Sequence, residues 1–255
     1  LSKALGIHPA QWQRRRERHL PPNTSDDTHD IQHHFLHSAS LGKAARAVIV
    51  VTGIPEEANE LARSAGSNLD SVFARADKET AVAQVYIGPK PLDVLRVRSR
   101  LPHWFQHALD RSAGSQEMSI VTISAGVFAL LAFGDMSGEL LSKITEKTHA
   151  LFLVSPFLGT NCVRSKTLGR LGRLLGFPST AQCLSAIAPI VEELLERGKT
   201  VKVILGEEDQ LVNSNAVEEA FGQRFPAAFI VVKPRAHAPS PEELWPYENE
   251  DPRDP

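Results

Sequence analysis

Three polar residues of this chain could supply a nucleophile, a base and an acid that orients the base. Ser124, Asp209 and His237 occur in that order, and each follows a run rich in β-branched or other apolar residues. A serine hydroxyl is a weak nucleophile until a base takes its proton, and a carboxylate is needed to orient that base. Imidazole suits the base because it changes charge near neutral pH. The pattern therefore favours acyl-transfer chemistry at a serine.

The candidate nucleophile lies among small residues. The segment Thr122-Ile123-Ser124-Ala125-Gly126 joins a β-rich run at 118–123 to an alanine-rich helical run at 125–133. A sharp strand-to-helix turn exposes a serine hydroxyl, and it needs small flanking residues because strand and helix come close together. Gly126 meets this requirement, whereas Thr122 is larger than the usual glycine. In the alternative interpretation, Ser124 only caps the N-terminus of a helix.

The candidate acid and base follow two later apolar runs. Asp209 ends the turn Gly206-Glu207-Glu208-Asp209 after the run at 201–205, and His237 follows the run at 228–232. The interval between them has room for one helix and one strand, as a βαβ unit requires. Glu207 and Glu208 are competing carboxylates. The alternatives are an exposed acidic loop, with Asp209 capping a helix near 215, and a surface-loop histidine at 237.

Over residues 47–239 this arrangement resembles the α/β-hydrolase superfamily. The resemblance implies a catalytic triad of Ser124, Asp209 and His237. Among the three neighbouring carboxylates, Asp209 is the one whose distance in sequence from Gly206 matches the family. It also implies an oxyanion hole made by the backbone N–H groups of Ala125 and Ile54. The loop at 52–55 departs from the family, which commonly has His-Gly where this chain has Thr52-Gly53. The resemblance implies no cofactor.

Alternating runs predict the fold class. Continuous apolar runs indicate strands buried on both faces, and helices between them indicate a parallel sheet. We therefore expect an α/β fold: a three-layer, α/β-hydrolase-like, mostly parallel sheet of six or more strands, with helices on both faces and a short lid. The expected strands are 47–52, 81–87, 118–123, 150–154, 201–205 and 228–232, and the expected helices are 56–75, 92–111, 125–133, 180–197 and 215–224.

The expected domain is flanked by two different segments. Residues 1–40 are polar and histidine-rich, and we expect a poorly ordered arm with one edge strand near 31–37. The domain spans 41–239, and residues 240–255 form a tail in which Leu244 and Trp245 dock. Within the domain, residues 155–177 occupy the place of a lid. Their interleaved leucines and basic residues fit either an apolar lid face or, as we favour, an amphipathic surface helix packed on the core.

Composition bounds the function. The chain has 255 residues and a net charge of −2, with 23% charged residues. The overall charge therefore gives no indication that the protein binds nucleic acid or an anionic membrane. Two cysteines exclude a disulfide framework, and the apolar runs are too short to span a membrane. We expect a cytoplasmic protein of unknown oligomeric state, with an N-terminus that could be processed or truncated because the chain begins at Leu1.

Two other groups of residues could suggest different chemistry. His29, His33 and His37 are four residues apart, and a helix would place three imidazoles in one stripe, as in a metal site. Because the same residues fit a solvated arm or an edge strand, we expect no metal. Cys183 lies among apolar residues of an expected helix, which favours a buried structural cysteine over a nucleophile.

Two functions remain. The first is a serine hydrolase that cleaves a small-molecule carboxylic ester or thioester through an acyl-enzyme, with acyl transfer as a close variant. The second is a non-catalytic α/β-hydrolase-like module that binds or interacts. Thr122, the missing His-Gly and the non-standard segment Tyr86-Ile87-Gly88-Pro89 keep the second function open.

Overall fold

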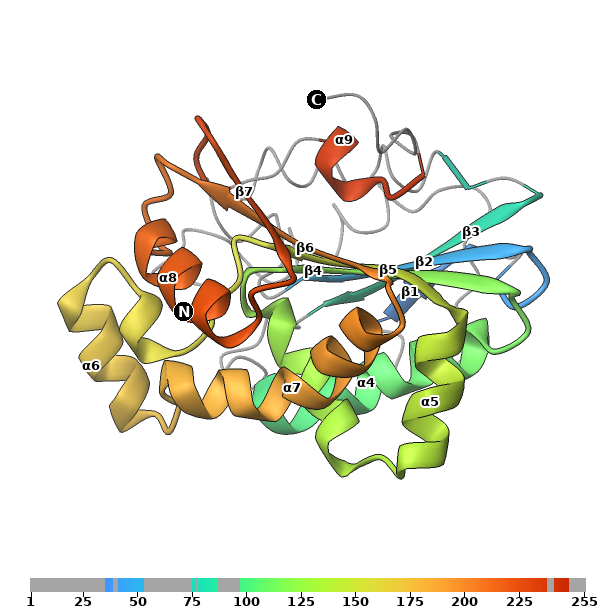
Figure 1. The fold of residues 1–255 in the computed structure, drawn as a ribbon, viewed down its shortest axis with the longest axis horizontal. Coiled ribbons are helices and arrows are strands. Elements are labelled where there is room, and N and C mark those ends of the chain that lie inside the picture. The colour runs from blue at the N-terminus through green and yellow to red at the C-terminus, as the bar shows by residue number, and fades with distance from the viewer. Residues whose placement is uncertain are drawn as a thin grey trace, which may run out of the picture.

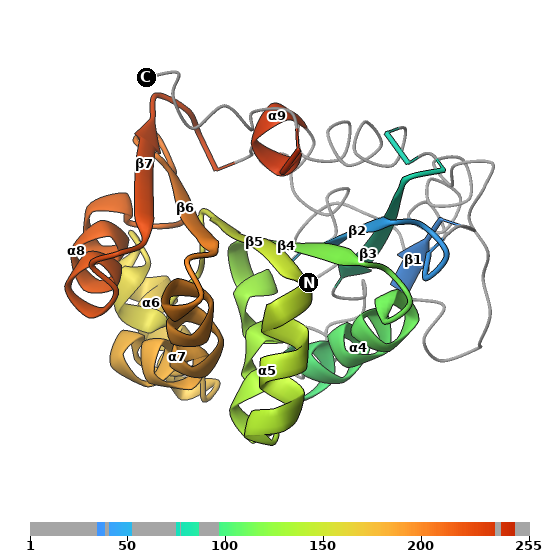
Figure 2. The same cartoon turned by 45° about the vertical axis from the view of Figure 1, so that its right-hand side comes forward.

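A single twisted sheet forms the centre of the protein (Figure 1, Figure 2). The computed structural model describes residues 35–38, 41–52, 75–76, 78–86, 97–237 and 241–247. In this part of the chain the strand order is β1-β3-β2-β4-β5-β6-β7, and every neighbouring pair is parallel except β1 with β3. The strands are β1 Phe35–His37, β2 Arg46–Thr52, β3 Thr80–Tyr86, β4 Glu117–Ile123, β5 Thr148–Val154, β6 Thr200–Gly206 and β7 Phe229–Lys233.

The expected strands are all confirmed, each within one or two residues of its predicted ends. For β2 and β4 the reason is burial on both faces, because they expose almost nothing after their first residue. The strand expected at 228–232 forms the edge strand β7, which is only partly buried. β4 lies between β2 and β5, so the predicted serine junction begins at the middle of the sheet. The predicted edge strand also occurs, as the short antiparallel β1.

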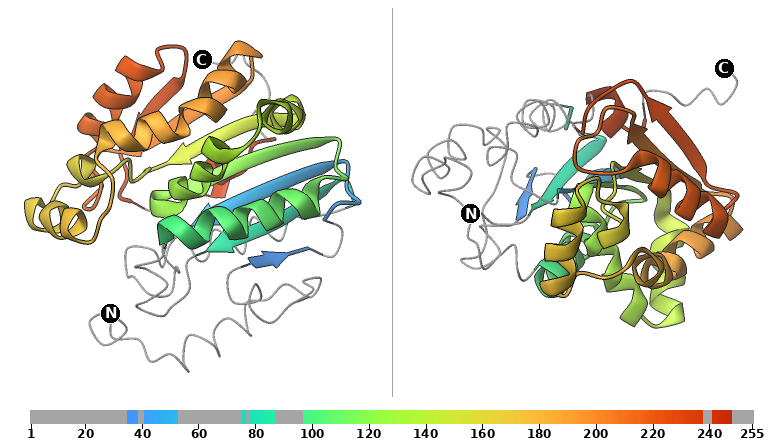
Figure 3. Two further views of the ribbon diagram at one scale, coloured as in Figure 1. Left: turned by 90° about the horizontal axis from the view of Figure 1, so that it is seen from below. Right: turned by 90° about the vertical axis from the view of Figure 1, so that its left-hand side faces the viewer.

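Helices cover the sheet unequally (Figure 1, Figure 3). The larger core cluster joins one face of the sheet to α4, η3, α5 and α7. The smaller cluster lies on the other face, where Leu244 of α9 and the following Trp245 pack on alternate strand residues such as Val50 and Val121. The helices are α4 Val97–Ser112, η3 Ser124–Asp135, α5 Gly138–Lys147, η4 Thr160–Cys162, α6 Lys166–Leu174, α7 Thr180–Glu196, α8 Ser214–Arg224 and α9 Pro241–Leu244.

One predicted helix has a different form, and one helix was not predicted. The run at 125–133, predicted to be helical, forms part of the 3-10 helix η3. The helix α5 was not predicted, because its residues are largely polar and only Thr145 is buried. The predicted helices at 180–197 and 215–224 are confirmed as α7 and α8, and Cys183 is fully buried within α7.

Docking of the C-terminal segment is confirmed. Leu244 and Trp245 are buried against the sheet, and the neighbouring Tyr247 stacks on His149. Tyr247 also lies under the guanidinium of Arg46, and its hydroxyl accepts a hydrogen bond of 3.2 Å from Ser119. This short segment therefore takes the place of a covering helix over part of the second face.

Several predictions fall outside the described residues. These include most of the 1–40 arm with His29 and His33, most of the helix predicted at 56–75, the first residues of the helix predicted at 92–111, and Ile54. The domain boundaries stay a prediction. None of the helices in the described segments is long and apolar enough to cross a membrane.

Candidate active site

The backbone at Ser124 makes a sharp turn directly after β4. Its φ of 54° lies in the left-handed region, which non-glycine residues rarely adopt and which is costly unless the surroundings enforce it. Two residues later, a Cβ on Gly126 would lie 2.2 Å from the carbonyl oxygen of Val51, so only glycine fits between this turn and β2. Ile123, not Ser124, is the cap residue of η3, and no side-chain hydrogen bond caps this helix. The capping interpretation of Ser124 is therefore wrong.

Neighbouring residues hold this turn. The backbone N–H of Phe157 donates to the carbonyl oxygen of Ser124 at 3.0 Å, which ties the turn to the segment after β5. Thr122 is fully buried, and its hydroxyl oxygen has no hydrogen-bond partner. The residue that departs from the usual glycine is thus accommodated, but with an unsatisfied polar atom.

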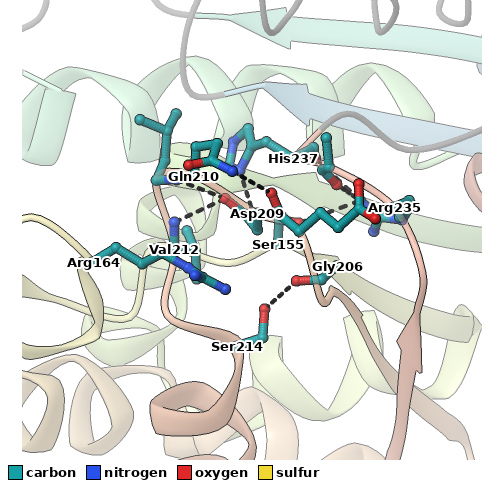
Figure 4. Close-up of polar contacts among 12 residues, drawn as sticks. Ser155, Arg164, Gly206, Asp209, Gln210, Val212, Ser214, Arg235 and His237 are labelled. Carbon is teal, nitrogen blue, oxygen red and sulfur yellow. Dashed lines mark hydrogen bonds and ion pairs between the residues drawn. The ribbon is translucent and has the colours of Figure 1, made fainter.

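Asp209 and His237 form a buried pair (Figure 4). His237 Nδ1 lies 2.8 Å from Oδ2 of Asp209, and both side chains are buried. The other carboxylate oxygen, Oδ1, accepts hydrogen bonds of 2.9 Å from the backbone N–H groups of Leu211 and Val212. The alternative interpretation placed both residues in exposed loops. It is wrong, because both side chains are buried. Asn213, rather than Asp209, caps α8.

The electrostatic environment keeps Asp209 ionised. Burial alone would raise its pKa, but the hydrogen bond and the charge of His237, with the backbone N–H groups of Val212 and Leu211, outweigh burial and lower the pKa below the ordinary value. An ionised carboxylate only accepts hydrogen bonds, so Nδ1 of His237 donates. Nε2 is then the ring nitrogen that can accept a proton.

The loop that carries His237 crosses closely over the end of β6. A Cβ on Gly206 would lie 2.4 Å from the carbonyl oxygen of Arg235 and 2.6 Å from that of Ala236, so glycine permits this approach. The backbone N–H of Glu208 donates to the carbonyl oxygen of Arg235 at 3.0 Å. Glu208 and its neighbour Glu207 are exposed, so neither competes with Asp209 for His237.

Arg235 joins this loop to α9 and was missed by sequence reasoning. Its Nε lies 3.0 Å from a carboxylate oxygen of Glu243, whose side chain is buried. Its Nη1 donates to the carbonyl oxygens of Ala236 at 2.8 Å and His237 at 3.2 Å. The same nitrogen makes a long contact of 3.5 Å with the hydroxyl of Ser155, a buried residue with a φ of 41° (Figure 4).

Ser155 could have been found from the sequence, because it directly follows β5 as Ser124 follows β4. Arg235 has no such signal, since its partners lie in other elements. Parallel strands place the four positions at the same edge of the sheet, Ser124 after β4, Ser155 after β5, Asp209 after β6 and His237 after β7.

The structure brings Asp209 and His237 into contact, whereas no hydrogen bond joins the hydroxyl of Ser124 to His237, two residues that both lie within the described segments. Such contacts are often long before substrate binds. Ala125 follows Ser124 at the start of η3. Ile54 lies outside the described residues, and β2 ends at Thr52, which pairs with Ile123 directly before the turn of Ser124. Within the described residues, no cluster of His, Cys, Asp and Glu could hold a metal ion.

Comparison with known proteins gives a structural likeness only. No protein-family model and no curated protein matches this chain. A carboxylesterase from Bacillus subtilis is similar in structure, with a TM-score of 0.52, 12% identity and 92% of each chain covered. An esterase from Thermogutta terrifontis, phosphonylated by sarin, has a TM-score of 0.50 and 16% identity over 86% of each chain. One of two metagenome-derived lipolytic enzymes has a TM-score of 0.50 and 15% identity over 80% of this chain and 89% of its own.

Proposed function

The chain has the α/β-hydrolase fold, and on that basis we propose that it is a serine hydrolase that cleaves a carboxylic ester or thioester through an acyl-enzyme. The observation that carries the proposal is the buried bond of 2.8 Å between Asp209 and His237, at the sheet edge where the strained turn of Ser124 lies. Both carboxylate oxygens of Asp209 accept hydrogen bonds inside the protein. An acid paired with an ordinary surface histidine would not need to be held in this way.

In the proposed first step, Oγ of Ser124 attacks the carbonyl carbon of the substrate while Nε2 of His237 takes the hydroxyl proton. The carbonyl oxygen gains the negative charge and accepts hydrogen bonds from the N–H groups of Ala125 and Ile54. The tetrahedral intermediate then collapses, and its bond to the alcohol or thiol breaks. The leaving group takes the proton from His237, which leaves an acyl ester on Ser124.

In the second step, His237 takes a proton from water as the water oxygen attacks the acyl carbon. The intermediate collapses with release of the acid, and Oγ of Ser124 recovers the proton from His237. Asp209 stays ionised throughout and stabilises the charged imidazole. An alcohol or amine in place of water gives acyl transfer with the same residues.

Three structural neighbours named as esterases or lipolytic enzymes support an ester substrate, and none of their names supports a thioester specifically. The alternative is a non-catalytic binding module. Two observations favour this module: the buried hydroxyl of Thr122 has no partner, and no hydrogen bond joins Ser124 to His237. The experiment must therefore distinguish a hydrolase from a binding module.

The test is turnover of short-chain p-nitrophenyl esters and acyl thioesters by the whole protein. We expect Ser124→Ala and His237→Ala to reduce kcat to near background, by on the order of 10⁶-fold, because one missing member disables the others. Asp209→Asn should cost somewhat less, on the order of 10⁴-fold. Ser185→Ala, at an exposed position of α7, is the control and should not change kcat. Absence of turnover in the wild type would select the binding module.

A further inference from the structure

The helix α6 packs on the protein through its glycines. A Cβ on Gly169 would lie 2.8 Å from the carbonyl oxygen of Thr160, and a Cβ on Gly172 would lie 3.1 Å from the methyl group of the same residue. These two glycines are three residues apart and share one side of the helix. The side of α6 that carries the two glycines therefore faces the rest of the protein. The larger side chains of α6 lie on its other sides.

Three leucines of this segment face outward. Leu171 is 50% exposed, Leu174 is 85% exposed and Leu175 is 48% exposed. The described residues include only two other exposed large hydrophobic side chains, Leu140 and Phe229. Our expectation that the leucine face packs on the core is therefore wrong for these three residues, because the close approach of the glycines turns the leucines away from the body. We call Leu171, Leu174 and Leu175 the α6 leucines.

Basic residues accompany the α6 leucines. Lys166, Arg170 and Arg173 are exposed, and none of them forms an ion pair with another described residue. The sequence from 147 to 191 contains no Asp or Glu. Arg164, just before α6, donates from Nη2 to the carbonyl oxygen of Glu207 at 2.8 Å, so the exposed Glu207 lies near the start of the helix. The surface therefore has a local positive charge, although the whole chain is slightly acidic.

We propose that this face of α6 docks onto an anionic phospholipid surface. Leucines can enter the boundary between headgroups and acyl chains, while lysine and arginine side chains beside them bind lipid phosphates. With nine residues, α6 is too short to span a membrane and fits a helix lying in the interface plane. A second copy of the chain is the less favoured occupant, because two such faces would bring like charges together. This inference does not depend on the proposed function.

The segment that leads into α6 lies beside the candidate active site. Val163, just before α6, pairs with Val212 in an isolated β-bridge, and the N–H of Asn213 donates to the carbonyl oxygen of Cys162 at 2.8 Å. Val212 in turn binds Asp209 through its backbone. A bilayer docked on α6 would thus adjoin the turn that carries Asp209, at the end of the molecule where α6 projects (Figure 1).

The test is sedimentation of the full chain with vesicles. We expect binding to vesicles of phosphatidylcholine and phosphatidylglycerol in equal parts, weak binding to phosphatidylcholine alone, and release by added salt. Leu174→Ser and the double variant Arg170→Glu with Arg173→Glu should each lower partitioning about tenfold or more. The matched control is Leu140→Ser with Lys143→Glu, which alters an exposed leucine and an exposed lysine on α5 and should bind as the wild type.

A second measurement places the contact. In Leu174→Trp, the added tryptophan should shift its emission to shorter wavelength with anionic vesicles and not with neutral ones. The proposal is overturned by no binding to anionic vesicles, by equal loss in the α5 control, or by binding to neutral vesicles that salt does not weaken. A dimer in solution that Leu174→Ser abolishes, without vesicle binding, assigns the face to a second copy and overturns it too.

Discussion

At the scale of single residues, Asp209 divides its two carboxylate oxygens between two tasks. Oδ1 is held by the N–H groups of Leu211 and Val212, and Oδ2 is held by His237. The backbone therefore fixes where the carboxylate lies, and the carboxylate fixes the ring of His237. Because these bonds favour the charged form, they make the stability of the fold depend on pH.

The pH dependence has a definite sign. The pKa of Asp209 is lower in the folded protein than its ordinary value of about 4 in the unfolded chain. As pH falls below that ordinary value, the unfolded chain takes up the proton first, so the free energy of unfolding decreases until pH passes the folded pKa. We expect Asp209→Asn to flatten this acid-side decrease, measured by urea unfolding at a series of pH values. Equal pH slopes in both proteins would contradict this assignment.

Thr122 offers a second residue-scale test. Its buried hydroxyl has no partner, and an unsatisfied buried polar group costs about 1–3 kcal/mol. Thr122→Val keeps the shape and removes the hydroxyl, so we expect the free energy of unfolding to stay the same or to rise by about 1 kcal/mol. Thr145→Val is the control, because that buried hydroxyl donates to the carbonyl oxygens of Leu141 and Ser142 and its loss should destabilise. Comparable destabilisation in both variants would show that Thr122 has a partner in solution.

Sequence reasoning found the residues whose place depends on strand ends. Ser124, Asp209 and His237 each follow a strand-like run, and parallel strands bring such positions to one edge. Arg235 could not be found this way, because its role rests on Glu243 of α9 and on Ser155, which are distant in the chain. Its identity alone suggests only a surface charge.

At the scale of elements, α9 acts on the loop of His237 through the buried carboxylate of Glu243. Glu243 is buried and contacts both Arg235 and Lys233. Arg235 in turn binds the carbonyl oxygen of His237 at 3.2 Å. We infer that the ion pair of Arg235 and Glu243 positions His237, the proposed base, without touching the proposed nucleophile.

We expect Glu243→Gln to lower kcat for ester turnover roughly tenfold with little change in KM, because small displacements of a base are costly for rate. A substitution that only destabilised the fold would leave the kcat of the folded fraction unchanged. Glu139→Gln breaks an exposed ion pair with Lys143 on α5 and is the control. If kcat per folded molecule matches the wild type, Glu243 has no positioning role.

Sequence patterns predicted the buried elements and missed a helix that is largely exposed. The strands were found because burial on both faces selects continuous apolar runs, as in β2. The helix α5 was missed because it is largely polar, although Ser137 caps it and Glu139 pairs with Lys143 four residues later. In η3 the alanine-rich composition predicted a helix correctly but not its 3-10 form, which follows the sharp turn at Ser124.

At the scale of the whole molecule, the described residues from β2 to α9 contain a complete core on one face of the sheet and a docked C-terminal segment on the other. The arm at 1–30 lies before the first described strand. We expect its removal to change the free energy of unfolding by less than about 1 kcal/mol, since it lacks apolar periodicity. Thermal and urea unfolding of a chain starting at Ile31 measure this. A loss of several kcal/mol would show that the arm is part of the core.

The central claim is that Ser124 is a nucleophile activated by His237. The most direct measurement is labelling by a fluorophosphonate probe followed by fragmentation mass spectrometry, because only an activated serine reacts rapidly. We expect the wild type and Ser185→Ala to carry the phosphonyl group on Ser124, and Ser124→Ala and His237→Ala to remain unlabelled while folded by circular dichroism. An unlabelled wild type, or a Ser124→Ala variant that labels as well as the wild type, would contradict the account.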